Sequence, residues 1–129
     1  MTNKDAKFHF CKHCGNLVGM IFNSGAEMTC CGEPMLELVP NTVEASHEKH
    51  LPVIDISGEE VTVKVGSVAH PMTDEHFIEW IYLETRHGGQ RRALKPGDYP
   101  EASFSLHGEE AVAAYAYCNI HGLWETKVK

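Results

Sequence analysis

Near the end of the chain stands the run Ala111-Val112-Ala113-Ala114-Tyr115-Ala116-Tyr117-Cys118-Asn119-Ile120-His121. The alanines of its first part would suit a helix, but the run lies between two turns and carries aromatic residues, which favour a strand. Another strand-like run follows from Trp124 to Val128. Cys118 and His121 are therefore expected in the turn that joins two strands of an antiparallel sheet.

Short strand-like runs continue this pattern upstream. Residues 61–65 and 102–106 alternate between apolar and polar side chains, which is the pattern of a half-buried strand. Residues 52–56 and 77–85 are rich in β-branched and aromatic residues. The predicted turns are Ser57-Gly58-Glu59, Gly88-Gly89 and His107-Gly108-Glu109. About six or seven strands at this spacing predict a mainly β protein with an immunoglobulin-like antiparallel β-sandwich.

The chain divides near residue 38. Residues 1–38 hold four of the five cysteines and little that could form a core, so metal binding is expected to stabilise them. Structural zinc contributes roughly 10–16 kcal/mol in comparable peptides. An apolar run from Leu17 to Phe22 ends at Asn23-Ser24-Gly25, which predicts a hairpin turn. We therefore predict a small metal-binding domain over residues 1–38 and a sandwich domain over residues 39–129.

The composition excludes several classes of protein. With 129 residues, a formal net charge of −7 and 43% hydrophobic residues, the chain suits an acidic globular protein and not a partner of nucleic acid or anionic membrane. It has no apolar run that could span a membrane, and its start, Met1 to Lys7, has no apolar signal core. A cytoplasmic location is expected, where close cysteines bind metals and do not form disulfides.

Four cysteines predict one tetrahedral metal site. They are Cys11, Cys14, Cys30 and Cys31. Structural zinc is one interpretation, but an adjacent pair is unusual for a zinc ribbon, whose paired cysteines are usually separated by two residues. Adjacent side chains diverge in extended backbone, so the pair requires a bent chain. Iron in four thiolates would carry single electrons. The sequence pattern allows either zinc or iron at this site. Lys12 and His13 are expected to face solvent.

The remaining cysteine and several histidines suggest a second site. One thiolate with several neutral imidazoles suits a reactive iron or copper centre better than structural zinc. The chain has nine histidines, and those next to predicted strands or turns could converge with Cys118 on one rim of the sandwich. These are His50, His70, His76 and His121. His47 could instead pair with His50 as a ligand. The histidines expected at the surface are His9, His13, His87 and His107.

Five dispersed segments resemble the desulfoferrodoxin family, the two-iron form of superoxide reductase, across essentially the whole chain. In order, they are Cys11-Lys12-His13-Cys14-Gly15-Asn16, Cys30-Cys31-Gly32, Glu48-Lys49-His50-Leu51-Pro52, His70-Pro71-Met72 with His76 ahead of Trp80-Ile81, and Cys118-Asn119-Ile120-His121-Gly122-Leu123-Trp124. The first two are similar to a desulforedoxin-type iron module, and the others to a neelaredoxin-like domain. Matches in this order are far more specific than any one of them.

The resemblance implies a superoxide reductase that converts superoxide to hydrogen peroxide. It implies one iron in the four-cysteine site and a second iron with equatorial His50, His70, His76 and His121 and axial Cys118, so that His47 is not a ligand. It also implies that Glu48 approaches the open sixth position in the oxidised state and that Lys49 assists the substrate. A homodimer and a rubredoxin-like electron donor are implied as well. Without the resemblance, a non-catalytic rubredoxin-like electron carrier and a zinc-stabilised binding domain stay open.

Overall fold

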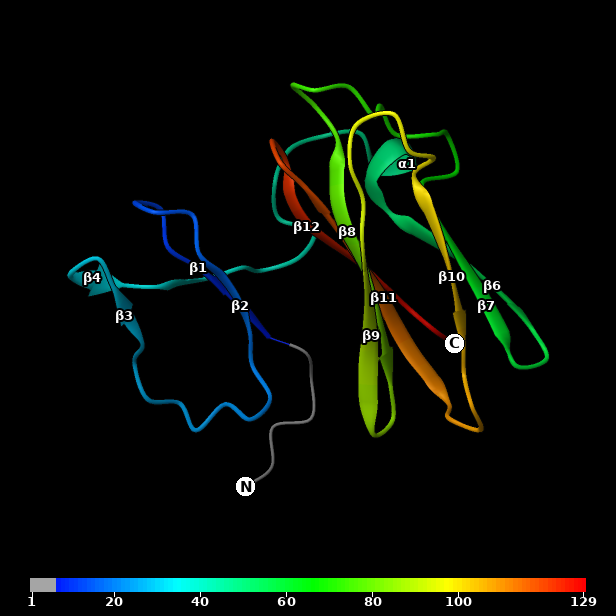
Figure 1. The fold of residues 1–129 in the computed structure, drawn as a ribbon, viewed down its shortest axis with the longest axis horizontal. Coiled ribbons are helices and arrows are strands. Elements are labelled where there is room, and N and C mark those ends of the chain that lie inside the picture. Colours follow the sequence, from blue (N-terminus) through cyan, green and yellow to red (C-terminus); the bar gives the residue numbers. More distant parts are fainter. Residues whose placement is uncertain (1–6) are drawn as a thin grey trace. The chain divides into compact units, whose positions relative to one another are not determined.

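The computed structural model describes residues 7–129, so the beginning of the predicted first domain, residues 1–6, lies outside the described residues. The described chain forms two compact units, and the boundary between them in the sequence lies between Val39 and Pro40. Figure 1 gives the order of their elements along the chain. In residues 7–129 no helix has the length and apolar character needed to traverse a bilayer.

The first unit consists of short strands and turns. Strands β1 (Phe8–Phe10), β2 (Leu17–Gly19) and β5 (Leu36–Glu37) form a sheet of order β2-β1-β5, and β3 (Thr29–Cys30) pairs with β4 (Glu33–Pro34). Its buried hydrophobic side chains, among residues 7–39, are Phe8 and Cys11. A unit with so little buried apolar surface gains little stability from hydrophobic burial.

The predicted hairpin in this unit is wrong. The apolar run forms a strand only as far as Gly19, and Ile21 is fully exposed. The Asn23 side chain accepts a hydrogen bond from the backbone amide of Gly25 at 2.9 Å. This is a local side-chain turn, and β2 pairs only with β1 among the described strands. Apolar character alone therefore did not extend the strand.

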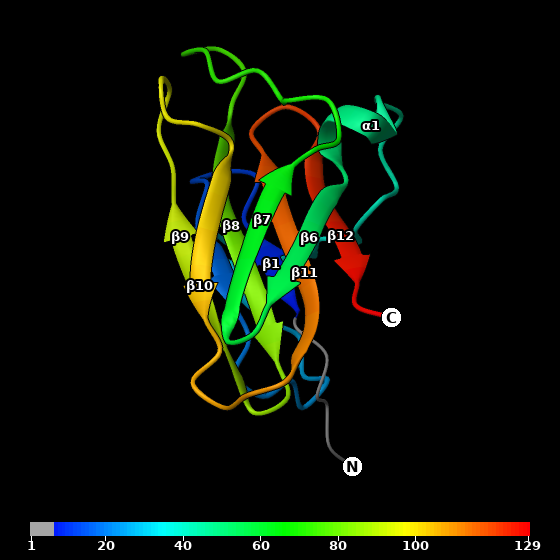
Figure 2. The same cartoon turned by 90° about the vertical axis from the view of Figure 1, so that its right-hand side faces the viewer.

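The second unit is a sandwich of two antiparallel sheets, of order β10-β7-β6 and β12-β11-β8-β9 (Figure 2). The strands are β6 (Pro52–Ser57), β7 (Glu60–Val65), β8 (Ile78–Thr85), β9 (Gly88–Ala93), β10 (Glu101–Ser105), β11 (Ala111–Cys118) and β12 (Gly122–Lys127). The core lies between the sheets, where Val61 and Val63 of β7 meet Ile81 and Leu83 of β8 with no exposed surface. The mainly β, antiparallel prediction is confirmed.

Strand β9 was not predicted, because Gly88-Gly89 was interpreted as a turn. The turn is instead Arg86-His87, and Thr85 pairs directly with Gly88. A Cβ built on Gly89 would overlap the phenol of Tyr82. Glycine therefore lies within a strand here because a neighbouring aromatic side chain fills the space of its own side chain.

One end of the sandwich gathers the segments that carry the second set of candidate ligands. Figure 2 shows the short helix α1 (His47–His50), the β7–β8 connection, the β9–β10 loop and the β11–β12 turn at the same end. The side chain of Asn119 ties two of these segments together: its Oδ1 accepts from the Phe77 amide at 3.0 Å and its Nδ2 donates to the Glu75 carbonyl at 3.0 Å. These hydrogen bonds help to hold the segments at this end of the sandwich, called the rim below, in fixed positions.

Candidate metal centres

The four cysteines of the first unit form one group. Cys11 follows β1, Cys30 ends β3, and the two others lie in the adjoining turns. Their four Sγ atoms lie within 4.8 Å of one another, and those of Cys14 and Cys30 are 3.6 Å apart. Metal–sulfur bonds of about 2.3 Å place the sulfurs of a tetrahedral site about 3.8 Å apart. The group therefore matches a tetrahedral metal site.

The bent backbone at the adjacent pair explains how both sulfurs reach one point. Cys31 has φ 53° and Gly32 has φ 78°, so the chain reverses within two residues. The corresponding turn after the first pair has Gly15 at φ 85°, and the Gly15 amide donates to the Cys11 carbonyl at 2.8 Å. Positive φ costs little for glycine and more for cysteine. The free-energy cost of the Cys31 conformation must be offset by the interactions that bring the four sulfurs together.

The thiols of this group resist simultaneous ionisation. Hydrogen bonds from the backbone amides of Cys14 and His13 lower the pKa of Cys11 to about 6. The thiols of Cys14 and Cys11 raise the pKa of Cys31 to about 12. One thiolate thus forms readily at Cys11, while the raised pKa of Cys30 and of Cys31 keeps these two thiols protonated unless a cation replaces their protons. This donor set fits a bound divalent metal.

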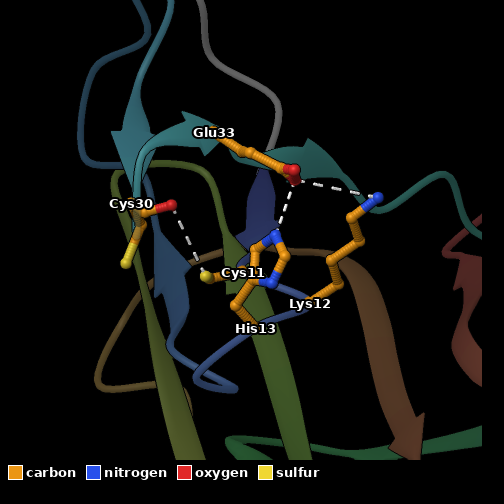
Figure 3. A network of polar contacts seen from close by, with 5 residues as sticks. All are labelled: Cys11, Lys12, His13, Cys30 and Glu33. Atoms are coloured by element: carbon orange, nitrogen blue, oxygen red, sulfur yellow. Dashed lines mark hydrogen bonds and ion pairs between the residues drawn. The ribbon is translucent and has the colours of Figure 1, made fainter.

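Lys12 and His13 are exposed, as predicted. Figure 3 shows both side chains meeting Glu33: His13 Nε2 lies 2.6 Å and Lys12 Nζ lies 3.9 Å from Glu33 Oε2. Neither residue belongs to the ligand group. The ion pairs tie the first cysteine turn to β4, beside the second pair.

In the second unit, the predicted donors come together at the rim of the sandwich. His50 ends α1, His70 and His76 lie between β7 and β8, Cys118 ends β11, and His121 precedes β12. The ligand atoms of His50, His76, Cys118 and His121 lie within 4.8 Å of one another. His70 adjoins this group through its Nε2, which is 3.2 Å from Nε2 of His50.

The four imidazoles form a square. Neighbouring ring centroids are 4.6 Å apart for His50–His70, 4.6 Å for His70–His76, 5.1 Å for His76–His121 and 4.9 Å for His121–His50. Across the square, His50 and His76 are 6.2 Å apart. Metal–nitrogen bonds of about 2.1 Å place adjacent nitrogens of such a square about 3.0 Å apart. The observed distance from His50 Nε2 to His121 Nδ1 is 3.1 Å.

Hydrogen bonds on the far side of two rings fix which nitrogens face the centre. His50 Nδ1 lies 2.7 Å from the Ser46 carbonyl, and His70 Nδ1 lies 2.6 Å from the Pro71 carbonyl. A carbonyl only accepts, so each Nδ1 carries the proton and each Nε2 of the neutral ring offers a lone pair. Two lone pairs then face each other at 3.2 Å. A cation between them removes the repulsion.

A proton does not fill this role at neutral pH. Burial lowers the pKa of His70 to about 4 and also lowers the pKa of His50 and His76. The His76 Nε2 atom is buried and has no hydrogen-bond partner in the described structure. A buried nitrogen of this kind needs a partner, and a metal ion at the centre of the square supplies one. The residues present therefore fit a metal.

Cys118 completes the donor set from within the core. It is fully buried, and its Sγ lies 3.9 Å from His121 Nδ1. Burial raises the pKa of its thiol, while the backbone amides of His121 and Ile120 lower it. The His121 amide donates to the sulfur at 3.4 Å. A metal cation is therefore the partner that makes this buried thiol a thiolate.

Glu48 and Lys49 lie on α1 next to His50, and both are exposed. The charge of Lys49 contributes to the lowered pKa of His50 and of His76, after the larger effect of burial. The Glu48 carbonyl accepts from the Val68 amide at 2.9 Å. A Cβ built on Gly66 would lie 2.5 Å from that same carbonyl. The helix thus lies directly on the backbone of Gly66.

Several residues at the rim were not singled out from the sequence or were left open. Trp124, fully buried, has its ring centroid 4.9 Å from that of His50 and donates from Nε1 to the His121 carbonyl at 3.1 Å. Its place in the last quoted segment was the available signal. His47 is exposed, with its ring 5.5 Å from that of Trp124, and lies outside the ligand group. Asn119 orders the turn that carries His121.

Known proteins are similar to this chain in sequence and in fold. A family model described as Desulfoferrodoxin matches residues 42–127. A desulfoferrodoxin homolog from Archaeoglobus fulgidus is 47% identical over 116 residues, which cover 90% of this chain and 92% of that protein. The crystal structure of the superoxide reductase from Treponema pallidum has a TM-score of 0.80 at 40% identity, covering 95% of this chain and 99% of that one.

A smaller solved structure matches part of the chain. The superoxide reductase (1Fe-SOR) from Giardia intestinalis is 32% identical with a TM-score of 0.56, and the match covers 64% of this chain and 98% of that one. Family model, sequence and fold agree over most of the chain. The chain belongs to the desulfoferrodoxin family.

Proposed function

We propose that this protein is a superoxide reductase that acts at the site of four histidines and one cysteine. The observation that carries the proposal is the square of imidazoles with the buried Cys118 thiol beside it. Proteins named superoxide reductase resemble the chain in sequence and fold. The reaction consumes one superoxide, one electron and two protons and yields one hydrogen peroxide.

The metal ligands in this proposal are two separate sets. Cys11, Cys14, Cys30 and Cys31 hold the first ion, and His50, His70, His76, His121 and Cys118 hold the catalytic ion. Five protein donors would leave room on such an ion for one ligand from outside. Iron at this second site would supply the electron to superoxide and take it back from a donor.

Charge decides which site meets the substrate. Ferrous iron with four thiolates would carry net negative charge, whereas ferrous iron with four neutral imidazoles and one thiolate would carry net positive charge. An anion is repelled by the first and attracted by the second. The whole chain has a net charge of −7, so local positive charge must guide the anion. Lys49, whose charge acts on His50 and His76, supplies it.

Glu48 and Lys49 are the residues that we assign to the reaction beside the ligands. Lys49 would hold water near the bound anion and so help to deliver protons, and Glu48 would approach the metal ion in its oxidised state. The Glu48 backbone is fixed by the amide of Val68 and the hydroxyl of Ser67, whose oxygen lies 3.2 Å from the Glu48 carbonyl. Both side chains are exposed, which leaves them free to move toward the substrate.

The first site serves as an accessory in this proposal. Iron there would relay single electrons, and zinc there would only stabilise the unit. A rubredoxin or a similar small carrier is the proposed donor, and the protein acts as a cytoplasmic homodimer in superoxide detoxification. Metal analysis with a visible spectrum separates iron from zinc in each site.

Product analysis tests the proposed activity against its alternatives. Protein pre-reduced with ascorbate is mixed with a known amount of superoxide under argon, and peroxide and oxygen are measured. A reductase yields one peroxide per superoxide and no oxygen, whereas a dismutase releases oxygen. A non-catalytic electron carrier or a zinc-stabilised binding domain leaves superoxide to its spontaneous decay, which would refute the proposal.

A further inference from the structure

Three cations fall within five residues of one another in the sequence of a chain that is otherwise acidic. Arg91 and Arg92 lie on β9, Lys95 lies in the loop after it, and all three are exposed. None of the ion pairs found within residues 7–129 includes any of them. Arg86, in the turn before β9, by contrast lies 3.8 Å from Glu110. β9 is an edge strand of its sheet, so this positive surface can reach a partner.

An exposed aromatic residue follows these cations in the sequence. Tyr99 is 83% exposed and lies in the same loop as Lys95. Tyrosine and arginine are enriched at protein interfaces and among the residues that carry binding energy. The loop is a fixed structure: the Lys95 amide donates to Asp98 Oδ2 at 3.0 Å, and the Gly97 amide donates to the Met72 carbonyl at 3.0 Å. It is thereby anchored two residues from His70.

The pairing of the strands places β9 in the same sheet as the strand that ends at Cys118, with β8 between them. Cys118 pairs with Ile78 of β8, and the Leu94 amide at the end of β9 donates to the carbonyl of the next residue, Glu79, at 2.9 Å. Adjacent strands are about 4.8 Å apart, so the chain at Leu94 lies about 10 Å from the strand that ends at Cys118. The cations at the end of β9 therefore lie on the sheet that carries the buried Cys118 thiol.

The substrate approaches from another side. Helix α1 with Lys49 lies beside β12, as the contacts of His47 and His50 with Trp124 require. β9 is the opposite edge of the same sheet. Figure 2 shows the β9–β10 loop and α1 at the same end of the sandwich but over different strands. Donor and substrate can therefore occupy the protein together.

We infer that Arg91, Arg92, Lys95 and Tyr99 form the docking surface for an acidic electron-donor protein. The inference rests on the proposed function, because only a reductase needs one external electron for each superoxide. One electron leaves the reduced centre of the donor and reaches the oxidised metal site, and no bond or proton is exchanged between the proteins. Unpaired cations select a donor with carboxylates around its redox centre.

Charge reversal with a matched control tests this surface. The variant Arg91→Glu/Arg92→Glu is compared with Lys127→Glu/Lys129→Glu, which causes the same change in net charge at and beyond the end of β12, the opposite edge strand. The oxidised proteins are mixed anaerobically with a reduced acidic rubredoxin in a stopped-flow instrument, at low and at high salt. Superoxide reduction by ascorbate-reduced protein is measured in parallel.

The Arg91→Glu/Arg92→Glu variant should accept electrons about tenfold more slowly at low salt, with a smaller difference at high salt. The control should change much less, and Tyr99→Ala should slow transfer without changing its salt dependence. Superoxide reduction should be the same in all variants. Equal slowing of both charge variants, or slowing of the superoxide step alone, would overturn the docking surface. Failure of ascorbate-reduced wild type to form peroxide would instead refute the proposed function itself.

Discussion

The four thiols of the first unit lie at strand ends and in turns, two of them exposed, whereas the five donors of the second unit lie on a sandwich with a buried core. Around the thiols, the buried hydrophobic side chains among residues 7–39 are Phe8 and Cys11. Around the imidazoles, backbone carbonyls of Ser46 and Pro71 already fix two rings. The first site therefore depends on its metal for its shape, and the second is shaped by the protein before metal binds.

This difference also separates two kinds of chemistry. A site that the metal itself organises suits structural binding or simple electron transfer, because closed coordination leaves no place for a substrate. A site that the fold organises can hold a metal with an incomplete coordination shell, because the protein prevents the ligands from closing around it. Substitutions at the two sites should accordingly have different consequences.

The largest effect is expected at Cys118. Cys118→Ser should reduce superoxide reduction by at least about 100-fold and abolish the thiolate-to-iron charge-transfer absorption, because a hydroxyl does not ionise to replace the thiolate. Visible spectra of the oxidised protein and pulse-radiolysis rates measure both. The fold should survive, since serine is similar in size. Unchanged spectra would remove Cys118 from the metal site.

A large structural effect without loss of activity is expected at Cys30. Cys30→Ser should destabilise the first unit by a sizeable part of the roughly 10–16 kcal/mol that a complete structural metal site contributes. NMR spectra should then show loss of dispersed signals from residues 7–39 only. Superoxide reduction by ascorbate-reduced protein should be retained. If activity disappeared as well, the first site would do more than stabilise or relay.

A tenfold effect is expected at Lys49. Lys49→Ala should slow the reaction of superoxide with the reduced protein about tenfold at low salt, because the anion loses local attraction. The difference should shrink as salt is added. Lys64→Ala, at an exposed lysine of β7, is the matched control and should leave the rate unchanged. Equal rates for both variants would show that Lys49 is only a solvated side chain.

The smallest effect concerns pH and the metal-free protein. Burial lowers the pKa of His70 to about 4 and lowers that of His50 and His76, while unfolded histidines titrate near about 6.5. Between these values the unfolded chain binds more protons, so the free energy of unfolding should fall as pH decreases from about 6.5 toward 4. Urea unfolding at several pH values measures it. His70→Leu should flatten this dependence, whereas His107→Asn, at an exposed imidazole, should not.

Much of the sandwich could be predicted because alternation follows burial. Val61, Val63 and Val65 alternate with polar residues, and all three are fully buried. Strand β9 was not predicted because its first residues are Gly88-Gly89, which are typical of a turn. Only the three-dimensional structure shows that the Tyr82 side chain fills the space above Gly89. Helix α1 was not predicted because it has only four residues and no side-chain cap at Ser46. Such short elements are set by tertiary contacts and not by local sequence.

The sequence predicts which residues form the candidate site better than it predicts how their side chains are oriented. Residue types and neighbours singled out His50, His70, His76, His121 and Cys118, and the structure brings them together. The sequence could not indicate which nitrogen of each ring faces the centre, because that depends on carbonyls from distant turns. Nor could it indicate the support from Trp124, whose contacts cross from β12 to α1.

Gly66 shows how far the constraint of the site extends into the chain. It lies outside the donor set, yet a methyl group there would lie 2.5 Å from the Glu48 carbonyl and 3.0 Å from that of Leu51. Any larger residue would push the helix outward and carry Glu48, Lys49 and His50 with it. In a library randomised at position 66 and selected for growth under superoxide stress, glycine alone should persist. The most restricted position of such an enzyme can thus be one with no side chain and no chemistry of its own.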